Sequence, residues 1–135
     1  MRGLRVLCVL GSLALACAGA GSARATIPRG KWGGEHAVLT VSDGGATVQF
    51  GCAHGTIPGP LALDADGRFS VPGDFVPEHG GPIRAGEVEE HRPVRYYGRV
   101  RGRKMVLSAR MGADREEIGP YTLEHGSDGW IVRCR

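Results

Sequence analysis

The five histidines of this 135-residue chain have the widest chemical range among its side chains, because imidazole binds metal ions and transfers protons near neutral pH. No two of them stand two or four residues apart, the spacings that pre-form a chelate on a strand or a helix. His54 shares the parity of Phe50 and Cys52, so we expect it to point inward at one end of the fold. His79 lies in an irregular stretch that could bring it beside His54. We therefore predict a histidine-containing ligand site, with no metal and no other cofactor.

Catalytic motifs of the common enzyme classes are absent from the sequence. There is no serine nucleophile elbow, no HExxH zinc motif and no phosphate-binding loop. Adjacent pairs such as Glu78-His79 and Glu116-Glu117 do not define a catalytic dyad. We therefore predict a protein that is not an enzyme, and a metal- or histidine-dependent enzyme is the third class of function considered.

The cysteines indicate the compartment. Of four cysteines, Cys8 and Cys17 fall in the N-terminal segment, which leaves Cys52 and Cys134 for the folded domain. Two cysteines in an exported chain most simply form one disulfide, and the long loop between them would contribute at most about 4.5 kcal/mol of stability. A zinc site would need more thiolates, and a redox site would need a CxxC pair.

Residues 1–25 have the three parts of a secretory signal: an arginine-containing start, an apolar run and small-residue cleavage sites. The apolar run is about 15 residues, shorter than the roughly 20 that span a membrane, so no membrane span is predicted. Cys17 follows small and apolar residues, which leaves a lipid anchor at Cys17 as an alternative. The predicted location is secreted or periplasmic, or anchored as a lipoprotein.

Net charge excludes one broad class of partner. The formal charge of +3 belongs to the arginines of the N-terminal segment, and the remainder of the chain is formally neutral. General binding to nucleic acid is therefore not expected. Charge is nevertheless segregated, because residues 35–91 hold nine acidic and two basic residues while residues 92–115 hold eight basic and one acidic.

Alternation places the basic residues of this second segment on one outer face, with Arg95, Tyr97 and Arg99 opposite Val94 and Tyr96. Such a stripe could bind an anionic glycan or a lipid headgroup. The favoured interpretation is a solvated hairpin that pairs with the acidic half of its own molecule.

From residue 26 onward the pattern predicts an all-β domain. Apolar residues recur with period two, and turn sequences such as Ser42-Asp43-Gly44-Gly45 separate the runs. Eight sequential strands with short connections favour a closed antiparallel up-and-down barrel, in which Cys52–Cys134 would join the second strand to the last; a β-sandwich is the alternative. The predicted strands are 36–41, 46–52, 60–63, 68–71, 94–100, 104–110, 118–124 and 130–134.

The segment Gly30-Lys31-Trp32 resembles the G-x-W entry motif of the calycin-like barrels, the lipocalins and avidins. The resemblance implies that Trp32 closes the bottom of the barrel and that a late basic residue, matched here by Arg133, packs on it. The second lipocalin signature is absent, and the biotin-contacting set of avidins has no match. The chain also resembles small secreted bacterial proteins of unassigned function.

The predicted function is binding of a small, partly apolar ligand in the barrel mouth, under a long loop at 73–93. The alternative is a protein–protein interaction module, or an inhibitor of an extracellular enzyme, that uses the same loop as an arm. A deep apolar pocket under the loop would favour the first, and a filled barrel with a protruding loop the second. The predicted ligand-binding residues are Trp32, Phe50, His54, His79, Tyr96 and Leu107.

Overall fold

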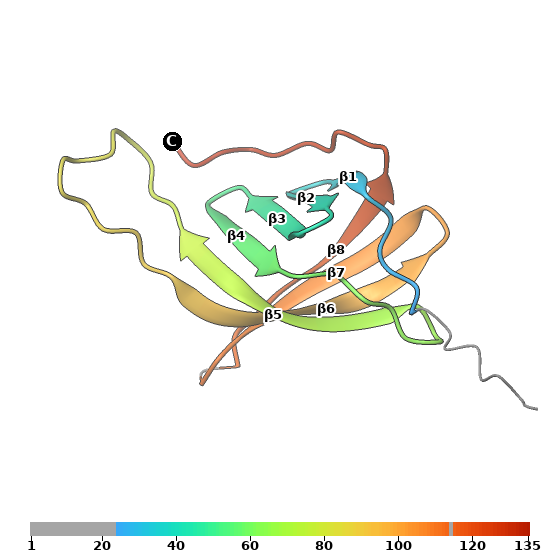
Figure 1. The fold of residues 1–135 in the computed structure, drawn as a ribbon. Helices are drawn as coiled ribbons and strands as arrows, with labels where there is room; N and C mark the ends of the chain where they lie inside the picture. The colour runs from blue at the N-terminus through green and yellow to red at the C-terminus, as the bar shows by residue number, and fades with distance from the viewer. Residues whose placement is uncertain (1–23, 114) are drawn as a thin grey trace, which may run out of the picture.

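The computed structural model describes residues 24–113 and 115–135, so most of the predicted signal segment, including Cys17, lies outside the described residues. The described chain forms a closed barrel in which every strand runs antiparallel to its sequence neighbour and the first strand pairs with the last (Figure 1). This confirms the predicted up-and-down barrel and excludes the sandwich. The strands are β1 (Gly30–Gly34), β2 (Ala37–Ser42), β3 (Gly45–Phe50), β4 (Ala53–Pro58), β5 (Arg68–Pro77), β6 (Arg92–Arg101), β7 (Lys104–Met111) and β8 (Glu117–His125).

Two tight turns set the register of the hairpins. Ser42 pairs with Gly45, and Asp43-Gly44 alone connects β2 to β3. Arg101 pairs with Lys104, so Gly102-Arg103 alone connects β6 to β7, with Gly102 at a φ of 57°. Two-residue connections that contain glycine match the twist of the flanking strands, because glycine adopts a positive φ without steric cost.

The barrel interior is filled by side chains. Trp32 and Tyr96 are fully buried, and Leu107 is 1% exposed. The interior of an eight-stranded barrel is just wide enough for side chains to occupy, and residues from all eight strands meet in one apolar cluster. The largest fully buried side chains are Trp32, Tyr96, Leu39, Ile57, Leu61, Met105, Leu107, Leu123, Val48 and Val76.

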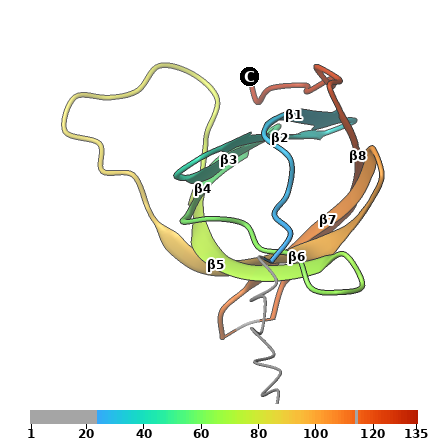
Figure 2. The same cartoon turned by 45° about the vertical axis from the view of Figure 1, so that its right-hand side comes forward.

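The two halves of the barrel differ in strand length. Strands β1 to β4 have 5 or 6 residues each, whereas β5 to β8 have 8 to 10. In Figure 2 the long strands form a curved sheet beneath the short ones, and the connection from β5 to β6 leaves the barrel on the side of β4. The long strands therefore provide the broadest outer face of the molecule.

The strand count was predicted correctly, but two of the strands were placed wrongly. Residues 60–63 form only a single bridge, between Ala62 and Thr26, and residues 130–134 follow β8 without forming a strand. The missed strands are β1 and β4. Their glycines hide the alternation, yet glycine is required at some of these positions: a Cβ at Gly55 would lie 2.0 Å from the Tyr96 hydroxyl.

The disulfide connects a turn to the C-terminal segment. Cys52 lies in the turn between β3 and β4, and Cys134 lies in residues 126–135, with the two Cα atoms 5.2 Å apart. The predicted disulfide is confirmed, but it does not join two strands. Closure of the barrel comes instead from the backbone pairing of β1 with β8.

The long connection is shorter than predicted. Strand β5 continues to Pro77 and β6 begins at Arg92, so the irregular stretch covers residues 78–91 rather than 73–93. We call residues 78–91 the arm. Among the described residues, no helix has the length and apolar character needed to cross a membrane.

Candidate functional site

The arm carries the most exposed large apolar side chains of the described residues. Ile83 is 82% exposed and Val88 is 89% exposed. The arm extends away from the barrel in both ribbon views (Figures 1 and 2). Contiguous exposed apolar surface marks interaction sites, and these two side chains stand five residues apart on one connection.

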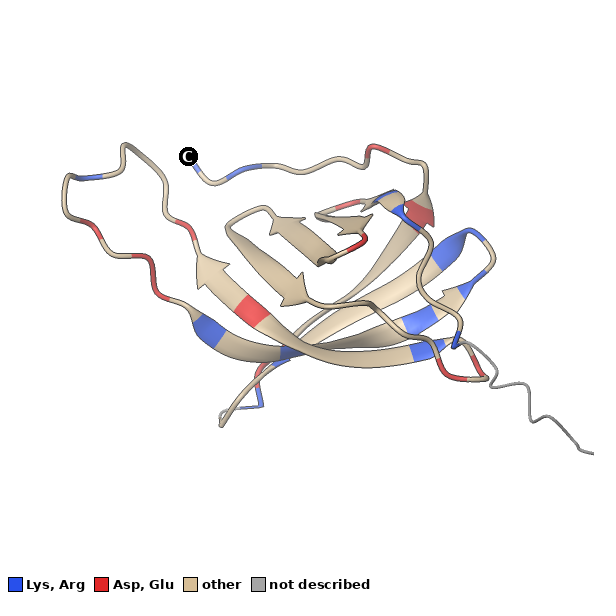
Figure 3. Ribbon diagram, viewed as in Figure 1, with Lys and Arg blue, Asp and Glu red and all other residues tan. Residues whose placement is uncertain are grey.

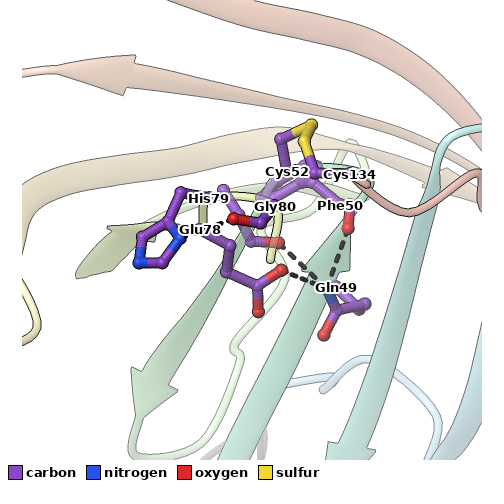
Figure 4. The surroundings of a disulfide bond; sticks show 8 residues. Gln49, Phe50, Cys52, Glu78, His79, Gly80 and Cys134 are labelled. Atoms are coloured by element: carbon purple, nitrogen blue, oxygen red, sulfur yellow. Dashed lines mark hydrogen bonds between the residues drawn. A yellow bond between two sulfur atoms is a disulfide. The ribbon is translucent and has the colours of Figure 1, made fainter. Parts of the chain in front are cut away.

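The first stem of the arm is fixed beside the disulfide (Figure 4). His54 Nδ1 lies 2.8 Å from Glu78 Oε1, and Gln49 Nε2 donates to Glu78 Oε2 at 3.3 Å. The same Gln49 nitrogen also donates to the Phe50 carbonyl at 2.8 Å. The backbone N–H of Glu78 donates to the Cys52 carbonyl at 2.8 Å. The arm therefore leaves the barrel from a partly buried polar cluster.

The second stem is held by Asp74. His91 Nδ1 lies 2.8 Å from Asp74 Oδ2, while the backbone N–H and hydroxyl of Thr56 donate to Asp74 Oδ1 at 2.7 and 2.8 Å. Burial by itself raises the pKa of Asp74, but the hydrogen bonds from His91 and Thr56 outweigh it and lower the pKa. The Tyr96 hydroxyl donates to the Asp74 carbonyl at 2.6 Å, and burial raises the pKa of Tyr96.

A third histidine–carboxylate pair lies within the arm. His79 Nε2 contacts Glu87 Oε1, and the backbone N–H of Arg84 donates to Glu87 Oε2 at 3.0 Å. The hydrogen bond to the Gly80 carbonyl, and then the pairing with Glu87, raise the pKa of His79. The hydrogen bond from the Arg84 backbone, and then that from His79, lower the pKa of Glu87. The arm is thus closed on itself by polar contacts.

The C-terminal segment contacts the arm near its start. A Cβ at Gly80 would lie 1.7 Å from the Arg135 carbonyl oxygen, so only glycine allows the two backbones to approach this closely. The Cys52–Cys134 disulfide fixes this part of the segment, and the Cys134 N–H donates to the Gly51 carbonyl at 3.1 Å. The disulfide therefore supports the arm as well as the barrel.

The predicted ligand-binding residues do not lie together. Trp32, Phe50, Tyr96 and Leu107 are buried in the apolar cluster, whereas His79 is in the arm. None of the four buried residues lines the surface hollows that lie beside β5 and β6, beside β8, or within the arm. A ligand in the barrel mouth therefore stays a prediction.

Two placements made from the sequence are wrong. His54 lies on the outer side of β4, because Gly51 and Cys52 form a turn that breaks the alternation and leaves Ala53 facing inward. Arg133 does not pack on Trp32, since it is an exposed residue beyond β8. The residue of the last strand that packs on Trp32 is His125, whose ring is stacked on the Trp32 indole at a centroid distance of 4.6 Å.

No group of three or more His, Cys, Asp or Glu side chains within residues 24–113 and 115–135 is arranged to hold a metal ion. His54 and His79 each bind a different carboxylate, His54 that of Glu78 and His79 that of Glu87. The chain matches no family model, and no similar curated protein or solved structure was found. The closed eight-stranded barrel is consistent with a calycin-like fold.

The basic segment is not neutralised by the acidic half of the chain. Acidic residues gather on the arm and basic residues along β5, β6 and β7 (Figure 3). Arg92 pairs with Glu90, but Lys104 and Arg110 pair with glutamates of β8, which lies outside the acidic segment. The favoured sequence interpretation therefore fails for most of the basic residues, and the basic outer face persists in the fold.

The histidine–carboxylate pairs are the functional feature that sequence reasoning missed. His54 and Glu78 are 24 residues apart, and Asp74 and His91 are 17 apart. No local spacing rule detects such pairs, because they depend on which strands are neighbours. The one available signal was the density of Glu and His around the irregular stretch.

Proposed function

We propose that this protein is an exported interaction module that binds another extracellular or periplasmic protein through the arm. The observation that carries the proposal is the exposure of Ile83 and Val88 on a protruding connection whose two stems are fixed. Export is supported by the signal-like residues 1–25 and by the Cys52–Cys134 disulfide, which is compatible with an oxidising compartment.

Fixed stems favour binding because they lower its entropic cost. Ordering a loop when a partner binds costs free energy for each residue immobilised. In the arm, the pairs His54–Glu78 and Asp74–His91 already fix both ends, and His79–Glu87 restrains the middle. The apolar side chains are thereby presented on a largely formed loop.

The surroundings of the apolar side chains indicate the chemistry of the partner. The arm carries Glu87, Glu89 and Glu90, of which Glu87 is bound by His79 and Glu90 pairs with Arg92, and Arg84 is the only lysine or arginine between positions 78 and 91, so the arm keeps an excess of negative charge. A complementary partner would offer an apolar groove with a basic rim, since opposite potentials across an interface accelerate association and fix its register. The barrel interior is filled by side chains, which supports this proposal, because the barrel then serves as a scaffold that holds the arm.

The test is site-specific crosslinking in the cells that make the protein. A photoreactive residue at position 83 or 88 is expected to capture one defined protein, and the same residue at Val106, which is 44% exposed on the outer face of β7, is the matched control. The complex captured through position 88 should disappear in the Ile83→Asp variant while the thermal unfolding temperature stays unchanged.

Equal capture from all three positions would contradict the proposal, because it would indicate nonspecific encounter. A complex captured through position 88 that survives Ile83→Asp, or one captured through position 83 that survives Val88→Asp, would contradict it as well. Both variants change highly exposed side chains of the arm, so loss of folding is not expected to confuse the result.

A further inference from the structure

The outer face of β5, β6 and β7 brings like charges directly opposite one another. In the strand register Arg95 faces Arg110, and Arg68 faces Arg99. All four lie on the outer side, since the alternate residues of these strands, such as Tyr96, are buried. Like charges directly opposite each other on a sheet are destabilising. An anionic ligand bound between these arginines would therefore reduce the repulsion between them.

The positive charge of this face is only partly compensated. Arg110 donates to Glu117 at 2.6 Å, and its guanidinium lies 5.2 Å from the centre of the Tyr97 ring. Arg95 donates only to the Ser70 hydroxyl, at 3.1 Å. Among the carboxylates of the described residues, none forms an ion pair with Arg95 or Arg68.

The same arginines border a surface hollow of about 1040 Å³. One wall consists of residues of the three strands, and the other consists of the segments 24–25 and 60–65, whose Pro60, Ala62 and Leu63 are apolar. Asp64 also borders the hollow, but its Oδ1 accepts the backbone N–H groups of Asp66 and Arg68 at 2.8 Å each. The polar strand wall is formed by Arg68, Ser70, Arg95, Tyr97 and Arg110.

We propose that this hollow binds a small amphipathic anion, an organic carboxylate or sulfonate with an apolar body. The acid group would lie beside Arg95 and Arg110, which face each other across β6 and β7, because guanidinium groups donate two parallel hydrogen bonds to oxyanions. The apolar body would lie along Pro60 and Leu63. The site is separate from the arm and does not depend on the arm's function.

Fluorescence titration with anilinonaphthalene sulfonate tests the site, since this probe has a sulfonate on an aromatic body. The full chain is expressed and the protein is recovered after export, so that its N-terminus is the one that processing leaves. Arg95→Gln should weaken probe binding by about tenfold, the typical loss of a charge-assisted hydrogen bond. Ser70→Glu, which places a carboxylate beside Arg95, should abolish it. Phenylnaphthylamine, the analogue without the sulfonate, should bind much more weakly than the probe.

Matched controls distinguish binding in the hollow from a general effect of surface charge. Arg101→Gln removes a basic residue of the same strand that does not border the hollow, and Thr40→Glu adds a carboxylate on the exposed side of β2. Neither should change probe affinity by more than about twofold. Equal weakening by Arg95→Gln and Arg101→Gln would overturn the proposal. It would also be overturned if heparin fragments bound and the probe did not, because that result would indicate an extended polyanion surface.

Discussion

The acidic arm and the basic outer face carry opposite charge, and they differ in how that charge is satisfied. On the arm and its stems, Glu78, Glu87 and Asp74 each bind a histidine. On the basic face, Arg95 and Arg68 bind no carboxylate of the described residues, and each faces another arginine across the sheet. The arm uses its charges to hold its own shape, whereas the face leaves its charges available.

This difference explains why the acidic and basic segments of the sequence form few ion pairs with each other in the fold. The arm leaves the barrel between β5 and β6, and its carboxylates are directed to histidines at its own base. The glutamates that reach the basic face, Glu117 and Glu124, come from β8 because β8 is the neighbour of β7. Strand order therefore decides which opposite charges meet.

The largest expected effect comes from removing the disulfide. Replacing both cysteines, Cys52→Ser with Cys134→Ser, should lower the free energy of unfolding in urea by up to about 4.5 kcal/mol, from the lost constraint on the unfolded chain. Amide exchange in the arm should accelerate, while probe binding to the hollow by the folded protein should not change. A stability loss below about 1 kcal/mol with unchanged exchange would contradict this role of the disulfide.

The second expected effect is a pH dependence confined to the arm. The raised pKa of His79 means that its stabilising contribution is present below the ordinary histidine pKa and is lost as pH rises through the raised value. The lowered pKa of Glu87 means that its contribution is lost only as pH falls through that lowered value. Amide exchange in the arm, corrected for intrinsic rates, should therefore be slowest at mildly acidic pH.

His79→Gln is the control for this pH effect, because glutamine does not titrate. It should remove the alkaline increase in arm exchange and leave the exchange of β6 and β7 unchanged. Identical pH profiles for the arm in the original protein and in this variant would show that another group is responsible.

The smallest expected effect comes from relieving the repulsion on the basic face. Arg99→Thr should raise stability by roughly 0.2–1 kcal/mol, because it removes one of two facing arginines and introduces a β-branched residue on a strand. The lost hydrogen bond from Arg99 Nε to the Asp66 carbonyl, at 3.1 Å, offsets part of this gain. Arg110→Thr is the matched contrast and should lower stability, since Arg110 has Glu117 as a partner. The gain should shrink in high salt, and a gain of equal size from both variants would contradict the distinction.

The sequence was sufficient to predict the barrel, because period two and the turns at Asp43-Gly44 and Gly102-Arg103 are local signals. The sequence was not sufficient to locate strands whose position depends on pairing in the closed barrel rather than on the local residue pattern. Strand β1 has one large apolar residue, Trp32, among three glycines, and its pairing with β8 is visible only in the closed fold. Leu61 is buried in the apolar cluster of the barrel, although its segment forms no ladder.

The candidate sites were less predictable than the fold. The stretch that contains the arm was recognisable from its irregular composition, and its exposed Ile83 and Val88 stand in that stretch. The residues that fix the arm were not recognisable, because His54 and His91 contact their carboxylates across neighbouring strands, and the sequence alone does not show which strands are neighbours. The direct opposition of Arg95 and Arg110 likewise depends on register, which a turn of two residues sets at the far end of the hairpin.

The two tryptophans of the chain, one fully buried and one 63% exposed, provide two independent optical reporters. Trp32 is enclosed by the barrel and stacked on His125, so its emission follows global unfolding. Trp130 lies in the C-terminal segment that leads to the disulfide, where its backbone N–H donates to the Gly34 carbonyl at 2.9 Å. Acrylamide should quench Trp130 in the native protein and spare Trp32, so detachment of the C-terminal segment and loss of the barrel can be followed separately in one unlabelled sample.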